Sequence, residues 1–186
     1  MFENVREDFA RHGRQLRNRA FWALAVYRFG RWSMGLRPAS LRWLTGKLYG
    51  VASLAAEIAT GVTMDRNAQI GSGFHILHAA TIFIHPSVVI GDRCGIMHGV
   101  TVGTNMDERV PVIGNDVFIG CGASVLGGIR IGDHVRIAAN SLVINDVPAN
   151  SFCAGVPART YRRLTAGRRS TAGADPPPRE PPAATG

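Results

Sequence analysis

The chain has 186 residues, of which 46% are hydrophobic, so its length and composition suit one domain with a sizeable core. Its net charge of +8 is uneven, because residues 1–50 carry ten basic and three acidic residues, a net charge of +7. One interpretation of this stretch is a solvated helical face, and another is peripheral contact with a membrane surface. No nucleic-acid motif accompanies the charge, so a nucleic-acid partner is not expected.

The cysteines bear on the compartment of the protein. Cys94, Cys121 and Cys153 form neither a C-x-x-C pair nor an even disulfide set, which predicts free thiols and a cytoplasmic location. The polar start of the chain does not resemble a secretory signal. The apolar stretch over 48–62 is too short to span a bilayer.

Residues 1–61 are predicted to form a helical N-terminal region. Apolar residues recur there at near-helical spacing among charged ones. Pro38 is expected to open the last of these helices, and Gly61 is expected to end it.

Residues 62–164 contain an internal repeat of six residues. One set of recurring residues is Ile113, Ile119, Val125, Ile131, Ile137 and Val143. A second set follows four positions behind: Val117, Ala123, Ile129, Val135, Ser141 and Val147. A period of six fits neither an amphipathic helix nor a simple hairpin sheet, but it fits short strands separated by tight turns. The sequence therefore predicts a mainly β protein with a parallel β-helix over 62–164.

The repeat is interrupted twice and then stops. Its register shifts by two residues after Ile82, and the interval from Val102 to Ile113 is eleven residues. Residues 104–110 are therefore predicted to loop out from a corner, where inserted loops of solenoids commonly carry binding function. Residues 165–186 are rich in Pro, Ala, Gly and Arg, which predicts a disordered tail.

Three motifs lie inside the repeat region. They are Ile76-Leu77-His78-Ala79-Ala80-Thr81, Gly99-Val100-Thr101-Val102-Gly103 and Ala154-Gly155-Val156-Pro157-Ala158-Arg159. Together they resemble the hexapeptide-repeat acyltransferases, specifically the serine acetyltransferase group and related polysaccharide O-acetyltransferases. The resemblance implies a left-handed β-helix, a homotrimer with active sites between adjacent chains, and acetyl-CoA as co-substrate with no metal.

The resemblance also implies the roles of the two central histidines. It makes His78 the catalytic base, which suits acyl transfer to a hydroxyl because imidazole titrates near neutral pH. A buried structural histidine is the plainer alternative. His98 is the next candidate, as an orienting group or second contact, with a structural surface role as its alternative.

Binding of the donor is implied along the coils. The resemblance places Gly103 and Thr104 beside the thioester, and Cys121 and Ala139 along the pantetheine arm. Arg159 is a candidate for the CoA phosphates, and a solvent-exposed arginine is equally compatible with its position after the last coil.

The acceptor site departs from serine acetyltransferases. Leu77 and Thr63 stand where those enzymes carry aspartates, and Val110 replaces a second active-site histidine. Arg109, which would meet a carboxylate, is retained. These differences favour a saccharide hydroxyl as acceptor, with serine O-acetylation in cysteine biosynthesis as the alternative.

Two other classes of protein use the same repeat. A zinc hydratase needs three converging imidazoles, yet only His134 lies beyond residue 98. A non-catalytic β-helix scaffold that binds a partner through its basic helices is the other alternative.

Overall fold

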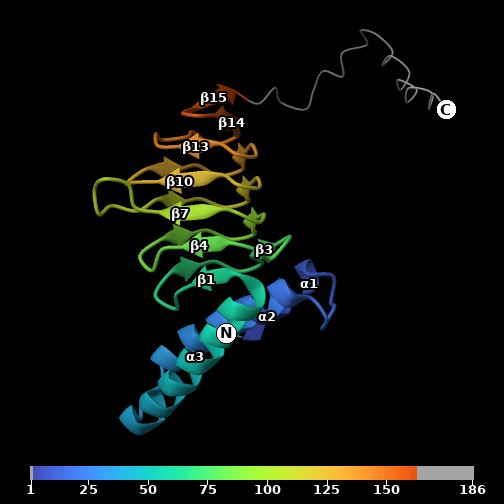
Figure 1. Ribbon diagram of the computed structural model, residues 1–186, viewed down its shortest axis with the longest axis vertical. Coiled ribbons are helices and arrows are strands. Elements are labelled where there is room, and N and C mark those ends of the chain that lie inside the picture. Colours follow the sequence, from blue (N-terminus) through green and yellow to red (C-terminus); the bar gives the residue numbers. More distant parts are fainter. Residues whose placement is uncertain (1, 163–186) are drawn as a thin grey trace, which may run out of the picture.

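A computed structural model describes residues 2–162, without the side chains of residues 2 and 162. Three helices precede a left-handed parallel β-helix, whose coils stack in one column (Figure 1). The helices are α1 (Phe2–Arg11), α2 (Arg19–Met34) and α3 (Ala39–Thr60). This architecture confirms the predicted fold class. The tail expected over 165–186 lies outside the described residues, and the division into domains stays a prediction.

Local signals set the limits of the helices. The Asn18 side chain accepts a hydrogen bond from the N–H of Ala20 at the start of α2. Helix α3 begins after Pro38 and ends at Gly61, which has a φ of 67° and donates its N–H to the Glu57 carbonyl. None of the helices in the described part of the chain is long and apolar enough to cross a membrane.

Short strands from successive coils form three parallel sheets. Sheet A contains β1 (Val62–Met64), β4 (Ile82–Ile84), β7 (Thr101–Gly103), β10 (Ser124–Leu126) and β13 (Leu142–Val143). Sheet B contains β2 (Gln69–Ile70), β5 (Val89–Ile90), β8 (Val112–Ile113) and β11 (Arg130–Ile131). Sheet C contains β3 (His75–Ile76), β6 (Gly95–Ile96), β9 (Phe118–Ile119), β12 (Arg136–Ile137) and β14 (Ser151–Gly155), with β15 (Ala158–Arg162) antiparallel to β14.

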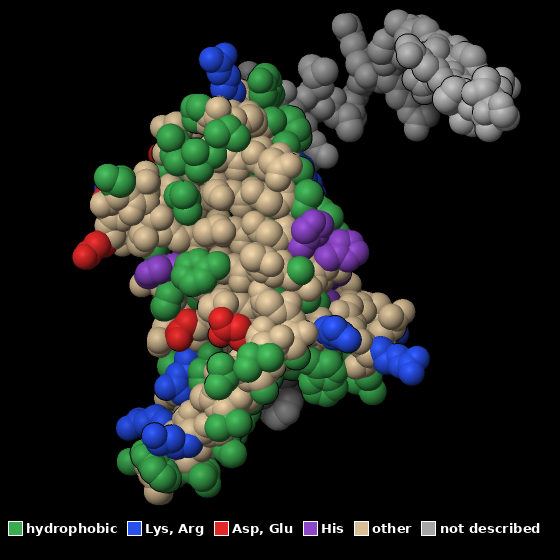
Figure 2. All heavy atoms as spheres, in the orientation of Figure 1, with side chains coloured by type: hydrophobic (Ala, Val, Ile, Leu, Met, Phe, Trp, Pro, Cys, Tyr) green, Lys and Arg blue, Asp and Glu red, His purple; other side chains and the backbone are tan. Residues whose placement is uncertain are grey.

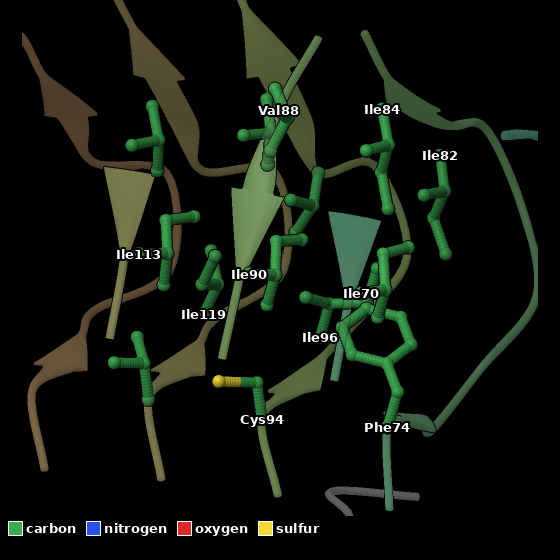
Figure 3. Close-up of a cluster of buried hydrophobic side chains, with 14 of the residues drawn as sticks. Ile70, Phe74, Ile82, Ile84, Val88, Ile90, Cys94, Ile96, Ile113 and Ile119 are labelled. Carbon is green, nitrogen blue, oxygen red and sulfur yellow. The ribbon is translucent and has the colours of Figure 1, made fainter. Parts of the chain in front are cut away.

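The core consists of inward-pointing residues that stack on their equivalents one coil away. In sheet B, the register aligns Ile70 with Ile90, Ile90 with Ile113 and Ile113 with Ile131. Figure 3 shows the first three of these side chains following one another from coil to coil. The residues of both predicted repeat sets are buried. Because Ile113 pairs with Ile131, one coil corresponds to three six-residue repeats. This burial is the driving force for stacking, because a single coil leaves its apolar edge exposed.

Helix α2 closes the open end of the first coil. The Arg28 guanidinium donates from Nε to Asp8 Oδ2 at 2.8 Å and also donates to the carbonyl oxygens of Ile70 and Gly71. Both charged side chains are buried, and the N–H of Phe74 donates to the same carboxylate. Backbone groups that a further coil would have satisfied are thus satisfied by side chains of the helical region.

Candidate active site

The corner between sheets C and A is wider in the first coil than in later coils. Leu77 and Ala80 hydrogen-bond to the second coil in the same way that the adjacent residues Met97 and His98 bond to the third. His78 and the alanine that follows it are therefore two extra residues, which explains the register shift in the sequence. That alanine packs against the core, whereas the His78 side chain is exposed.

His78 lies next to His98 of the following coil. Their ring centroids are 6.1 Å apart and their ring planes are inclined at 56°, and both side chains are exposed. The backbone beside them is strained, because Thr81 has a φ of 49° and β-branched residues rarely adopt positive φ. Later coils place residues that tolerate this conformation at the same turn position: Gly99, Gly122 and Asn140.

Small side chains continue the edge beyond His98. The N–H groups of Gly122 and Asn140 donate to the carbonyls of His98 and Cys121, so Cys121 and then Ala139 take the place of His98 in later coils. The pairing of β12 with β14 aligns Ile137 with Cys153, so Ala139 is followed by Gly155, and the hairpin sets Arg159 opposite the neighbouring Ala154. At about 4.8 Å per coil, the edge from His98 to the hairpin is roughly 15 Å long.

The predicted corner loop leaves from the opposite edge of sheet A, after β7 (Figure 1). Within it, Arg109 donates from Nε to Asp107 Oδ2 at 2.7 Å. The stem of Arg109 rests on Gly128 of the next coil, where an added Cβ would lie 2.7 Å from the Arg109 Cβ. This contact could not be predicted from the sequence, because the six-residue repeat continues unbroken past Gly127 and Gly128.

The predicted site residues thus fall into two groups within one chain. The corner between sheets C and A carries His78, His98, Cys121 and Ala139, and Arg159 follows them in the hairpin of sheet C. The other edge of sheet A carries Gly103, Thr104, Arg109 and Val110. Histidine side chains are visible at both edges of the coils in Figure 2. A single chain therefore does not bring the two groups together.

The side chains expected to form the acceptor site have different surroundings. Leu77 is half-buried beside Gly95, and Val110 is half-buried against the core. The Thr63 hydroxyl donates to the Glu57 carboxylate at 2.7 Å. No group of three or more His, Cys, Asp or Glu side chains in residues 2–162 is arranged to hold a metal ion.

The cysteines differ in their exposure. Burial raises the pKa of the Cys94 thiol to about 11, so this residue is a core side chain rather than a nucleophile. Cys153 is also buried, and burial raises the pKa of its thiol. Cys121 is half-exposed on the edge that follows His98, where its small side chain leaves room for an extended ligand.

The edge with the histidines can support proton transfer at one end and hold an extended ligand along its length. An exposed imidazole can take a proton from a hydroxyl group near neutral pH. Cys121 and Ala139, which follow His98 along the coils, have small side chains that leave room for a ligand. This combination suits transfer of a group between a long, flexible donor and a small acceptor.

Comparisons with known proteins agree with this description. The family model described as "Bacterial transferase hexapeptide (six repeats)" matches residues 111–145. The chain is 35% identical over 146 residues to a serine acetyltransferase of Synechococcus elongatus, covering 77% of this chain and 57% of that relative. It is 39% identical over 123 residues to a serine acetyltransferase of Helicobacter pylori, covering 63% of this chain and 72% of that relative. The chain thus spans a little over half the length of the first relative.

Solved structures give the same result. Serine acetyltransferase from Brucella abortus in complex with coenzyme A superposes with a TM-score of 0.71 at 27% identity, over 86% of this chain and 65% of that one. Soybean serine acetyltransferase complexed with serine superposes with a TM-score of 0.74 at 27% identity, over 85% and 68%. The chain therefore belongs to the serine acetyltransferase group of the hexapeptide-repeat, left-handed β-helix acyltransferases.

Proposed function

We propose that the chain is an O-acetyltransferase that takes an acetyl group from acetyl-CoA and transfers it to the hydroxyl of L-serine. The observation that carries the proposal is the widened corner, which holds His78 out of the stack beside His98. The neighbours in complex with coenzyme A and with serine support this donor and this acceptor. The saccharide acceptor expected from the sequence has no such support among the relatives.

In this proposal His78 is the general base. It takes the proton of the acceptor hydroxyl as the oxygen forms its bond to the acetyl carbon, and it then returns that proton to the sulfur when the carbon–sulfur bond breaks. Acetyl-CoA supplies the acetyl group as an activated thioester. The edge through Cys121 and Ala139 fits the long arm of this donor because its side chains are small, and Arg159 at its end suits phosphate groups.

The proposed site lies between two chains of a homotrimer. The two groups of predicted residues occupy opposite edges of sheet A, so the loop edge of one chain can complete the histidine edge of the next. A ring of three chains uses both edges of every chain and leaves neither unpaired. Light scattering at micromolar concentration tests this arrangement, and a stable monomer that retains activity would contradict it.

A saccharide hydroxyl is the second candidate acceptor. Leu77 and Val110 offer apolar surface rather than the acidic partner that a serine ammonium group needs, and an unmatched charge in a closed site is costly. The Arg109 guanidinium already contacts Asp107 through Nε and Nη2, so a serine carboxylate would compete with Asp107 for these donors or bind to Nη1. Serine and a saccharide would therefore occupy the same site, and their specificity constants distinguish them.

Steady-state kinetics with L-serine, homoserine and a panel of sugars tests the proposal through release of CoA. A specificity constant for serine on the order of 10⁴ M⁻¹s⁻¹ or more supports it. Turnover with sugars alone would replace serine by a saccharide and leave the reaction class intact. Failure of every acceptor to release CoA would support the non-catalytic scaffold instead.

A further inference from the structure

Helix α3 presents an apolar face that no other element in residues 2–162 covers. This α3 face consists of five residues: Leu44, Leu48, Val51, Leu54 and Ile58. All five are at least half exposed, reaching 74% at Val51 and 78% at Ile58. The opposite side of the helix packs against α2 through Thr45, Tyr49 and Thr60. An exposed apolar patch of this kind is typical of an interaction surface.

Exposed aromatic residues lie on the two helices α2 and α3. The chain has three tryptophans, Trp22, Trp32 and Trp43, and all of them are exposed on α2 and α3. The Lys47 ammonium lies 6.0 Å from the centre of the Trp43 ring. Tryptophan favours the boundary between lipid and water because its ring is apolar and its N–H is polar.

A groove between α2 and α3 opens beside the same face. Its walls are the small side chains Ala52, Ala55, Ala56 and Ala59 of α3, with Trp22 and Val26 of α2. The cavity measures about 680 Å³, and Arg19 is its one charged lining residue. An apolar groove lined by one guanidinium fits an acyl chain that is attached to an anionic headgroup.

The charge around the α3 face identifies its occupant. Residues 9–56 hold nine basic residues, of which Arg28 is buried against Asp8, so eight remain to face the surroundings. Glu57 is the one acidic residue of α3. Figure 2 shows Lys and Arg side chains among hydrophobic ones over the lower end of the molecule, where α3 projects from the coils. A second copy of this region would bring like charges together, whereas an anionic lipid surface neutralises them.

We infer that the α3 face and the adjoining groove dock on an anionic phospholipid bilayer. The aliphatic side chains and tryptophans enter the headgroup boundary, and the surrounding cations contact lipid phosphates. The acetyltransferase coils then stand away from the membrane on the far side of the helices (Figure 1). This inference does not depend on the identity of the acceptor.

Vesicle flotation of the full chain tests the inference. The probes are vesicles of phosphatidylcholine alone and of phosphatidylcholine mixed with phosphatidylglycerol. We expect binding to the mixed vesicles and little binding to phosphatidylcholine alone. Replacement of both Leu48 and Val51 by Glu removes binding, whereas Ile144→Glu, at an exposed position of the last coil, leaves it unchanged. Replacement of both Arg42 and Lys47 by Ala weakens binding by about fivefold for each cation removed.

Three outcomes would overturn the inference. Wild-type protein that fails to float with mixed vesicles has no anionic lipid surface as its partner. Equal flotation with both kinds of vesicle would mean that the charges have no part in docking. Self-association of the wild type that is lost in the doubly substituted Leu48 and Val51 variant, without any flotation, would assign the face to a second copy. Circular dichroism and acetyltransferase activity of each variant show whether it is folded.

Discussion

The ring centroids of His78 and His98 are 6.1 Å apart on successive coils, yet only His78 is one of the two extra residues that widen its corner. This placement frees the His78 ring from the regular stack and exposes it to an acceptor. We therefore predict that His78→Ala lowers kcat by about 10²–10⁴-fold, the usual contribution of a positioned base. The affinity for acetyl-CoA should stay unchanged, because the proposed donor contacts come from Cys121, Ala139 and Arg159 rather than from His78. Steady-state kinetics and calorimetric titration measure the two effects.

His134→Ala is the matched control for this substitution. His134 is also exposed, but it lies at another corner of the coils, 3.7 Å from the Asp116 carboxylate. Its replacement should leave turnover unchanged. If His78→Ala behaves like this control, then His78 is a structural residue and His98 becomes the candidate base.

The contact of the corner loop with Gly128 gives a second prediction. A Cβ at this position would lie 2.7 Å from Cβ and 3.0 Å from Cδ of Arg109, so Gly128→Ala must displace the arginine. We predict that kcat/KM for the acceptor falls on the order of tenfold, because small misplacements of a positioning residue are costly. Acceptor kinetics at saturating acetyl-CoA measure this effect.

Gly50→Ala serves as the control for the loop variant. Gly50 lies in α3, and nothing lies within 4 Å of a Cβ added there. This control should retain wild-type kinetics and gain about 1 kcal/mol of stability, since alanine is the better helix former. Identical acceptor kinetics for the two variants would show that the position of Arg109 does not matter to the reaction.

The strained turn beside the histidines gives a third prediction. Thr81 has a φ of 49°, and the equivalent residue Asn140 has a φ of 54°. Asparagine tolerates this conformation better than a β-branched residue does. We predict that Thr81→Asn raises the free energy of unfolding by about 1 kcal/mol and that Asn140→Thr lowers it by a similar amount. Urea unfolding of both variants measures the changes, and stabilisation by both would contradict a strain-based account.

The regular part of the fold could be predicted because its signals are local and repeated. Each member of the six-residue sets, such as Val125 or Val135, points inward because the coil returns to the same direction after three repeats. Pro38 and Gly61 set the limits of α3 through their own backbone preferences. These features need no knowledge of distant contacts.

The irregular part of the site depends on contacts between distant residues. The sequence showed a shift of two residues, but only the hydrogen bonds of Leu77 and Ala80 to the next coil identify which residues are extra. The contact of Arg109 with Gly128 joins residues in adjacent coils, and no periodic pattern records it. The acceptor expected from Leu77, Thr63 and Val110 was a saccharide, whereas the resemblance to serine acetyltransferases over 63–77% of the chain fits the serine alternative better.

The last prediction concerns how acid acts on the junction of helices and coils. The rings of His75 in β3 and His12 lie edge to face with their centroids 4.8 Å apart. Burial, together with the nearby charges of His12 and Arg11, lowers the pKa of His75 to about 4. In the unfolded chain the same group titrates near 6.5. Between these two values the unfolded chain binds more protons than the folded chain, so the contribution of His75 to stability is lost as the pH falls.

We therefore predict that His75→Gln flattens the dependence of stability on pH between about 6.5 and 4. Glutamine keeps a polar side chain at the junction but does not titrate, so the wild type should lose on the order of 2 kcal/mol more than the variant across this window. Urea unfolding at a series of pH values measures the difference, in which the contributions of all other titrating groups cancel. Parallel curves for the two proteins would show that the His75 imidazole takes up its proton as readily in the folded chain as in the unfolded one.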